Sequence, residues 1–183
     1  MWCCRALVHA LASIGGMVDD EVPWLTDDER RTWIAVSALI EVLSTSIDAQ
    51  LKRDSGLNLF EYLVMAGLSD APGQAIRMSD LAAFASGSLS RLSHAVSRLE
   101  KQGFVVRRPS PEDPRSTEAV LTDAGMAKMV ESAPDHVREV RRLLVDPLTP
   151  AQLAQLGRIS RQLIEHASPA AARRIEQVAP GTF

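Results

Sequence analysis

The sequence predicts a mainly α-helical protein that carries one short β hairpin, and three observations support this fold class. Apolar residues recur at spacings of three and four over several long stretches, which is typical of amphipathic helices. Aromatic residues make up only 4% of the 183 residues, whereas strands favour aromatic and β-branched side chains. A β-rich pattern occurs once, on either side of a proline-rich run at 109–114.

The first helix is expected to follow a flexible extension formed by residues 1–22. Met17 opens an acidic stretch that looks like an ordinary cytosolic N-terminus, so we expect either a natural start at Met17 or a mobile tail. Thr26 and the three acidic residues after it offer a helix cap and favourable charge for the helix dipole. Apolar periodicity then extends the helix to about Gly56, so we expect one long N-terminal helix within 23–56.

The next segment contains three further helices and two turns. A helix over 57–68 is followed by a breaker cluster at 70–73, and Ser79 is expected to cap a short helix over 80–85. Small residues at 86–88 supply a turn, and either Ser88 or Ser90 is expected to cap the following helix, which runs to Gln102. Gly103 stands where helices commonly end.

The hairpin and two more helices complete the chain. Residues 104–108 and 117–121 are expected to be its strands, so that 57–121 forms one helix-turn-helix unit with an attached hairpin. Helices are predicted over 123–145 and 150–167, the second with a capping box at Thr149 and Gln152. We therefore expect helices over most of 122–168 and a poorly ordered tail at 169–183.

The helix that begins at Ser88 has the pattern of a DNA-recognition helix. Leu89, Leu92, Val96 and Leu99 are expected to face the core, while the opposite side is polar and cationic. A short helix, a tight turn and such a helix are how a helix-turn-helix protein presents side chains to the major groove of DNA. Arginines on the hairpin could enter the adjacent minor groove. The predicted DNA-contacting residues are Ser88, Ser90, Arg91, His94, Ser97, Arg98, Lys101, Arg107, Arg108, Asp113 and Arg115.

Charge is distributed in agreement with this interpretation. The chain has a net charge of −3, which excludes a globally basic nucleic-acid binder. Residues 77–117, however, contain seven basic and four acidic residues, a net charge of +3, which leaves −6 for the remainder. Cationic side chains on an exposed helix are often merely solvated, so the prediction depends on their conjunction with the helix-turn-helix pattern and the hairpin.

Several segments, taken together and in order, resemble the MarR family of bacterial transcription regulators. The segments are 78–82, 88–100, 103–106, 111–115 and 119–125, within a resemblance that covers roughly 24–166. The resemblance implies a winged helix-turn-helix fold and a cytoplasmic homodimer that binds a palindromic operator, usually as a repressor. It also implies that Asp113 orients the guanidinium of Arg115 in the minor groove, and that Arg91 and Arg98 occupy recognition positions.

The resemblance further implies a subunit interface and a site for a small effector. The implied interface is built from the terminal helices, so we interpret 23–56 as an N-terminal dimerisation helix and 122–168 as C-terminal dimerisation helices. The apolar stripes of these helices are larger than one small domain could cover, which also favours a two-fold partner. The predicted interface residues are Val36, Ile40, Leu43, Val137, Val140, Leu144, Leu156 and Leu163. Relatives often bind aromatic or anionic molecules, and the corresponding candidates here are Trp33, Tyr62, Met65 and His136. Taken singly, residues of these types are more often ordinary core residues than ligand contacts.

Other classes of function receive little support. We find no catalytic triad, phosphate-binding glycine loop or dinucleotide fingerprint, so an enzyme is not expected, and neither is a cofactor. The only cysteines, Cys3 and Cys4, are adjacent and lack histidine partners at ligand spacing, so we expect a reducing cytoplasm and no structural metal. Redox sensing is not expected either, because some relatives use a thiol near the first helix and these cysteines lie more than twenty residues before it. The alternative to DNA binding is a winged-helix module that binds proteins, and DNA affinity that falls steeply with salt would separate the two.

Overall fold

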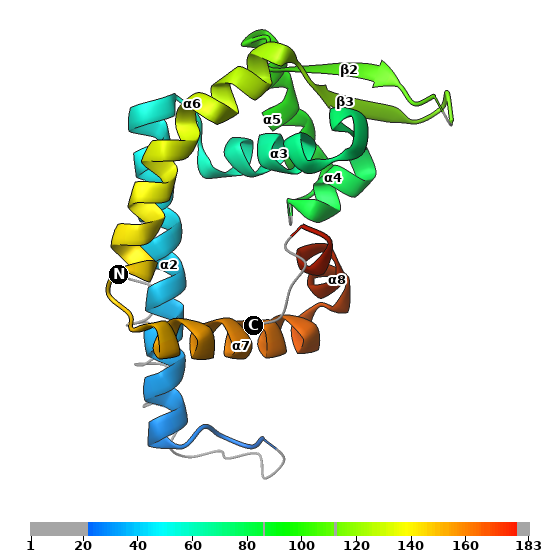
Figure 1. Ribbon diagram of the computed structural model, residues 1–183. Helices are drawn as coiled ribbons and strands as arrows, with labels where there is room; N and C mark the ends of the chain where they lie inside the picture. Colours follow the sequence, from blue (N-terminus) through cyan, green and yellow to red (C-terminus); the bar gives the residue numbers. More distant parts are fainter. Residues whose placement is uncertain (1–21, 86, 112, 179–183) are drawn as a thin grey trace. The chain divides into compact units, whose positions relative to one another are not determined.

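The computed structural model describes residues 22–85, 87–111 and 113–178, and it is mainly helical (Figure 1). The chain divides into two compact units, Met1–Thr45 and Ser46–Phe183. Its elements, in order, are α2 (Asp27–Ser55), α3 (Leu59–Asp70), the 3-10 turn η1 (Pro72–Gln74), β1 (Ala75–Arg77), α4 (Met78–Phe84), α5 (Leu89–Lys101), β2 (Val105–Pro109), β3 (Thr117–Leu121), α6 (Asp123–Val140), the π-helical turn η2 (Arg141–Val145), α7 (Pro150–Ala167) and α8 (Pro169–Val178).

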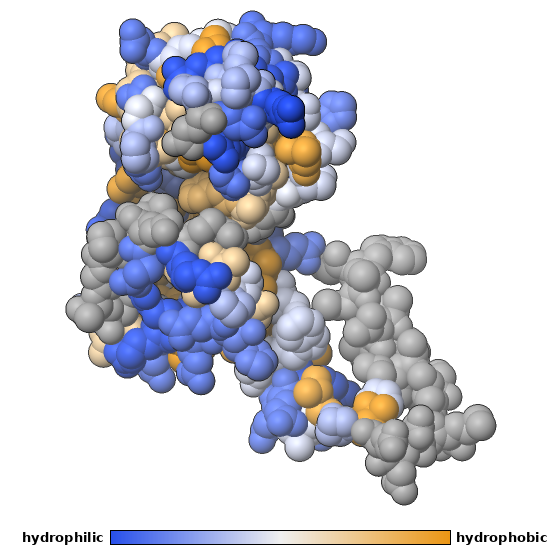
Figure 2. Space-filling model, turned by 90° about the vertical axis from the view of Figure 1, so that its right-hand side faces the viewer, coloured by the Kyte–Doolittle hydropathy of each residue, from blue (hydrophilic) through white to orange (hydrophobic). Residues whose placement is uncertain are grey.

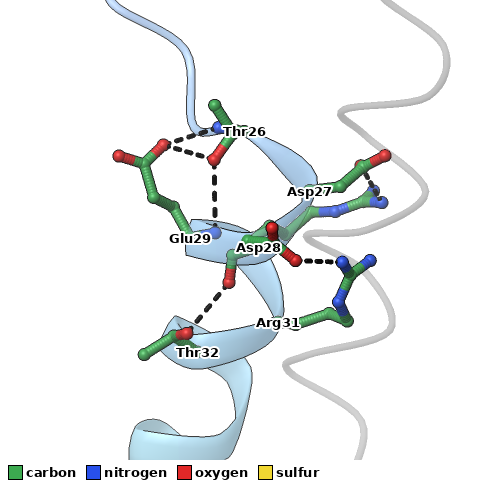
Figure 3. Close-up of polar contacts among 7 residues, drawn as sticks. Thr26, Asp27, Asp28, Glu29, Arg31 and Thr32 are labelled. Carbon is green, nitrogen blue, oxygen red and sulfur yellow. Dashed lines mark hydrogen bonds and ion pairs between the residues drawn. The ribbon is translucent and has the colours of Figure 1, made fainter.

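Helix α2 begins as the sequence predicts, with a reciprocal cap (Figure 3). The Thr26 backbone N–H donates to Glu29 Oε2 at 2.7 Å, and the Glu29 N–H donates to Thr26 Oγ1 at 3.3 Å. The first of these bonds is the main reason that the pKa of Glu29 lies below its ordinary value. Asp27 and Asp28 form ion pairs with the arginines three residues later, so the first turn is held by local contacts.

Much of the apolar surface of α2 is exposed in the single chain. Trp33 is 57% exposed, Ile40 61% and Val42 56%, whereas Leu51 near the end of the helix is fully buried. By length and composition alone, α2 is also the one helix in the described part of the chain that could cross a membrane. A long apolar surface of this kind needs a covering partner, whether lipid or protein.

The second unit has one hydrophobic core, built from α3, α4, α5 and a small sheet. Leu57, Met65, Leu81, Leu92 and Val105 are among its fully buried side chains. Helix α3 starts with a capping box between Asn58 and Glu61, as residues of these types at a spacing of three permit. The core therefore joins the helix-turn-helix to the hairpin.

The sheet has three strands, not the two expected from the sequence. Its order is β1-β3-β2, and all the pairs are antiparallel. Strands β2 and β3 are paired from Val105–Leu121 to Pro109–Thr117, which confirms the predicted hairpin (Figure 1). Strand β1 has only three residues, too few to show a period of two, and it is defined by pairing with residues more than 40 positions later.

Helix boundaries in the second unit follow local signals in most cases. Gly103 follows α5 with φ of +77°, a conformation that glycine adopts easily. The predicted helix over 150–167 is α7, with the capping box at Thr149 and Gln152 in place. Ser79, by contrast, does not cap α4, because that helix already begins at Met78.

Two expectations about the C-terminal third need correction. The predicted helix over 123–145 is α-helical only to Val140 and continues as the π-helical turn η2. Residues 169–178 of the expected tail form helix α8, which packs on α7 and carries an ion pair between Glu176 and Arg161. Pro169 at the first helical position and the alanines after it favour this helix.

Candidate nucleic-acid interface

Helix α5 has one buried and one exposed side, as its sequence pattern predicts. Leu92, Ala95, Val96 and Leu99 are buried in the core. Ser88 caps the helix by accepting a hydrogen bond from the Arg91 backbone N–H at 3.1 Å. The exposed polar side chains on the helix are Ser90, Arg91, Ser93, His94, Arg98 and Lys101. The helix therefore offers a polar, cationic face of the kind that enters a major groove.

The expectation that Leu89 faces the core is wrong. Its side chain is 57% exposed, although it lies three residues before the fully buried Leu92. Leu89 is the first residue of α5, where no preceding helical turn covers a side chain. The spacing correctly placed Leu89 in line with Leu92, but the core does not reach the first residue of the helix.

Arg91 is held against an aromatic ring of the neighbouring helix. Its guanidinium carbon lies 4.2 Å from the centroid of the Phe60 ring in α3, a cation–π arrangement. Arg91 is nevertheless exposed, so the stacked guanidinium keeps its outer edge accessible. No local pattern links these two residues, since they lie 31 positions apart in the chain.

Arg98 forms an ion pair with a buried carboxylate. Its Nε donates to Glu61 Oε1 at 2.5 Å, and the Glu61 side chain is only 4% exposed, compared with 51% for Arg98. Glu61 Oε2 also accepts from the Asn58 backbone N–H at 2.9 Å. Arg98 thus ties α5 to the start of α3, in addition to any contact it makes with DNA.

Arg107 connects the hairpin to α5 through several hydrogen bonds. Its guanidinium donates to Glu100 Oε2 at 2.8 Å, to the Ser93 carbonyl at 2.8 Å and to Ser97 Oγ at 3.2 Å. Its backbone N–H donates to Glu100 Oε1 at 3.1 Å. Since the side chain is only 28% exposed, Arg107 acts as a brace that fixes the hairpin relative to α5. Ser97 takes part in the same brace and is half-buried.

The remaining hairpin arginines are placed differently from each other. Arg108 pairs with Glu118, its direct partner across the β2–β3 ladder, at 3.2 Å. Arg115 is exposed in the loop between the strands, and its backbone N–H donates to Asp113 Oδ1 at 3.0 Å. The contact between these two loop residues thus runs through the backbone amide and shapes the turn. We refer below to β2, this loop and β3 as the wing.

The ion pairs change the local charge balance. Glu61 and Glu118 lie outside 77–117 but neutralise Arg98 and Arg108 within it. The net charge of +3 for this segment therefore becomes +1 when both carboxylates are included. Positive charge is concentrated at the exposed Arg91, Lys101 and Arg115 instead of being spread over the whole segment.

A shallow groove of about 500 Å³ lies between the start of α5, the wing and the β1–α4 junction. Leu89, Ser93, Arg107 and Thr117 are among its lining residues. Figure 2 views the molecule from the side on which the wing points towards the reader, and hydrophilic side chains dominate its upper part, with a few separate hydrophobic spots. The face around the wing is thus mainly polar.

The four candidate effector residues have different surroundings. The rings of Tyr62 and His136 lie 4.6 Å apart between α3 and α6, and burial raises the pKa of Tyr62 and lowers that of His136. Nδ1 of His136 is buried without a hydrogen-bond partner. Met65 is fully buried as a core residue, and Trp33 is exposed on the first unit. Within the described ranges, no cluster of side chains has the composition of a metal site, and Cys3 and Cys4 lie outside them.

The predicted interface residues are accessible to differing degrees. Val36, Ile40, Val137 and Leu163 are exposed, by 38–61%. Leu43, Val140, Leu144 and Leu156 are half-buried. Apolar side chains that the single chain leaves in water are thus present on α2, α6 and α7.

Helices α3, α4 and α5 pack with a three-stranded sheet, and two strands of that sheet form a hairpin with arginines on β2 and in its loop. This arrangement defines a winged helix-turn-helix protein. A model of the MarR family matches residues 57–117. The structure of Sco3205, a MarR family transcriptional regulator from Streptomyces coelicolor solved in complex with DNA, is 40% identical, with a TM-score of 0.78 over 83% of this chain and 95% of that one. The chain therefore belongs to the MarR family.

Curated relatives agree with this assignment. The HTH-type transcriptional regulator MhqR of Bacillus subtilis (strain 168) is 28% identical over 123 residues, which are 66% of this chain and 81% of that protein. The HTH-type transcriptional repressor IacR of Pseudomonas putida is 32% identical over 82 residues, 45% of this chain and 48% of that protein. The protein is accordingly a transcriptional regulator and not an enzyme.

Proposed function

We propose that the protein is a cytoplasmic homodimer that represses transcription by binding a palindromic operator, with α5 in the major groove and the wing in the adjacent minor groove. The observation that carries this proposal is the brace at Arg107. It fixes the direction of the wing relative to α5, so that Arg115 and the exposed face of the helix are presented together. A rigid pair of groove-binding elements suits recognition of one duplex.

Within this proposal the residues divide into two groups. Ser90, Arg91, His94 and Lys101 are exposed and can reach bases or phosphates, and Arg115 can reach the minor groove. Arg107 and Ser97, which the sequence suggested as contacts, serve mainly to position the wing. The Phe60 ring beneath Arg91 limits the freedom of that guanidinium before DNA is bound, which lowers the entropy lost on binding.

Dimerisation is supported by the uncovered apolar surface. Ile40 is 61% exposed, Val137 54% and Leu163 58%, and stable dimers bury such surfaces. A second copy would also cover the apolar side of α2, which otherwise satisfies the criteria for a membrane span. Two-fold symmetry of the protein then requires two half-sites, and hence a palindrome.

Repression and release by an effector are the finer parts of the proposal. One relative, IacR, is named a repressor, and a dimer seated on an operator would exclude other proteins from that DNA. Tyr62 and His136 are candidates to sense an aromatic or anionic molecule, since their rings meet between α3 and α6 at an interplanar angle of 47° and Nδ1 of His136 lacks a partner. A ligand that binds one arrangement of these helices better would shift the population towards it.

The test of DNA binding starts with selection of bound duplexes from random DNA by the full chain. We expect an enriched palindrome, with affinity that falls steeply as salt rises. Arg115→Ala should make the negative slope of log K against log salt shallower by about 0.9 for each phosphate that the variant no longer neutralises. It should also reduce the preference for A·T-rich flanks. Arg158→Ala, at an exposed position on α7, is the matched control. Failure to enrich any sequence, or binding that ignores salt, would favour a protein-interaction module instead.

The test of the dimer is the substitution Ile40→Asp. Because Ile40 is 61% exposed, the change should leave the fold of the single chain intact while placing a charge in the proposed interface. We expect a monomer by analytical ultracentrifugation and at least a tenfold loss of operator affinity. Glu41→Asp, at the neighbouring exposed position, controls for changes to α2 itself. A fully dimeric Ile40→Asp protein would show that the interface lies elsewhere.

A further inference from the structure

We propose that Leu89 reads thymine in the operator through an apolar contact with the C5 methyl group of that base. This inference rests on the proposed DNA binding and adds to it one specificity-determining residue. Leu89 is the first residue of α5, is 57% exposed, and lies beside the groove between α5 and the wing.

The position of Leu89 on the helix fits a base contact. The N-terminal residues of a recognition helix approach base edges most closely. Leu89 precedes Ser93 and Ser97 at steps of four, so the three lie in one row, and Arg107 donates to both of these serines. This row of three residues therefore faces the wing. Arg107 forms hydrogen bonds with Ser93 and Ser97, whereas the Leu89 side chain stays exposed.

The chemistry of the major groove then selects the base. All four bases present hydrogen-bonding groups there, but only thymine also presents a methyl group. This methyl lies at the outer edge of the base, close to the backbone of its own strand. When α5 fills the major groove and the wing enters the minor groove, that backbone passes between them, next to Leu89. Binding would then remove both the Leu89 side chain and the thymine methyl group from water.

The expected size of the effect is modest but measurable. Removing one methyl from a buried apolar contact changes affinity by about fourfold. Replacement of thymine by deoxyuridine removes only that methyl and keeps every hydrogen-bonding group of the base pair. Because Leu89 is exposed in the free protein, Leu89→Ala should leave the urea midpoint unchanged.

The experiment is a coupling cycle on an operator selected from random duplexes by the full chain. Each thymine is replaced in turn by deoxyuridine, and the affinity of the natural protein and of Leu89→Ala is measured. We expect one thymine per half-site at which the natural protein loses about fourfold on deoxyuridine, while Leu89→Ala binds the two duplexes equally. Leu63→Ala, the same substitution at a 40% exposed position on α3, should keep the full preference for thymine at that position.

Three results would overturn the inference. If the change from thymine to deoxyuridine lowers the affinity of the natural protein and of Leu89→Ala by the same factor at every position, Leu89 does not contact a thymine methyl group. A selected half-site without any thymine would remove the ligand that we assign. If no duplex is selected at all, the proposed DNA binding fails with it, whereas the first two results leave that proposal standing.

Discussion

Replacing Arg98 by alanine removes the cationic partner of Glu61, whose carboxylate lies in the interior of the second unit. The Arg98 Nε and Glu61 Oε1 atoms are 2.5 Å apart, and the glutamate side chain is 4% exposed. Breaking a fully buried pair on one side costs about 3–5 kcal/mol. Water can reach the vacated site, however, because Arg98 itself is 51% exposed. We therefore expect a loss of about 1.5–3 kcal/mol in the free energy of unfolding, as for a hydrogen bond to a charged group.

A second substitution separates the ion pair from other effects of losing Arg98. Glu61→Gln keeps an oxygen that can accept from the Asn58 backbone N–H, and so preserves the cap of α3, but it removes the charge. In that background Arg98→Ala should cost only about 0.5 kcal/mol, since no buried carboxylate remains to be solvated. The coupling energy between the two positions is then about 1–2.5 kcal/mol.

The assay is urea denaturation of the four proteins at one protein concentration and at neutral pH. One concentration is needed because a dimer gains apparent stability from association. Free energies that add to within about 0.5 kcal/mol would refute the reasoning, since contacting residues that share a buried charge must couple. Operator affinity is measured separately under conditions in which every variant is folded, so that weaker binding to DNA is not confused with unfolding.

Three further predictions test other features of the fold and the site. Gly125→Ala should lower the free energy of unfolding by at least about 1–3 kcal/mol, because a Cβ there would lie 2.2 Å from the Phe104 carbonyl oxygen; a decrease below about 0.5 kcal/mol in urea would contradict this close approach. Arg107→Met should weaken operator binding several-fold with an unchanged salt slope, whereas a slope smaller by about 0.9 would show that Arg107 touches a phosphate. Because burial lowers the pKa of His136 in the folded state, the unfolded chain takes up a proton first as pH falls through 6.5, so stability should decrease there and level off below the folded pKa. His136→Phe should flatten that part of the pH profile in thermal denaturation, and an identical profile would place the titration elsewhere.

The sequence was sufficient wherever structure depends on contacts within a few residues. The capping box at Thr149 and Gln152 indicated the start of α7, and Ser88 and Gly103 indicated the two ends of α5. The hairpin strands were also predicted, because a proline-rich run between two β-rich segments leaves few alternatives. Each of these features is formed by residues close together in the chain, and the corresponding residue types are visible in any short window.

Long-range contacts decided which of the predicted DNA-binding residues are available. Arg98 and Glu61 are separated by 37 positions and Arg107 and Ser93 by 14, so no local pattern distinguishes these engaged arginines from the exposed Arg115. Strand β1 exists because β3 pairs with it, since three residues alone have no stable conformation. The Asn58–Glu61 capping box joins residues three positions apart, whereas the arginine that binds this glutamate lies 37 positions away.

What the sequence by itself determined, then, is the order of the longer helices and the hairpin, where most of these helices begin and end, and a cationic helix followed by that hairpin. The tertiary structure decided which arginines bind groups of the protein itself and which are free to contact DNA, and it left the Leu89 side chain exposed to solvent. The physical reason is that local conformation depends on neighbours in the chain, whereas the partner and exposure of a side chain depend on what folding brings against it.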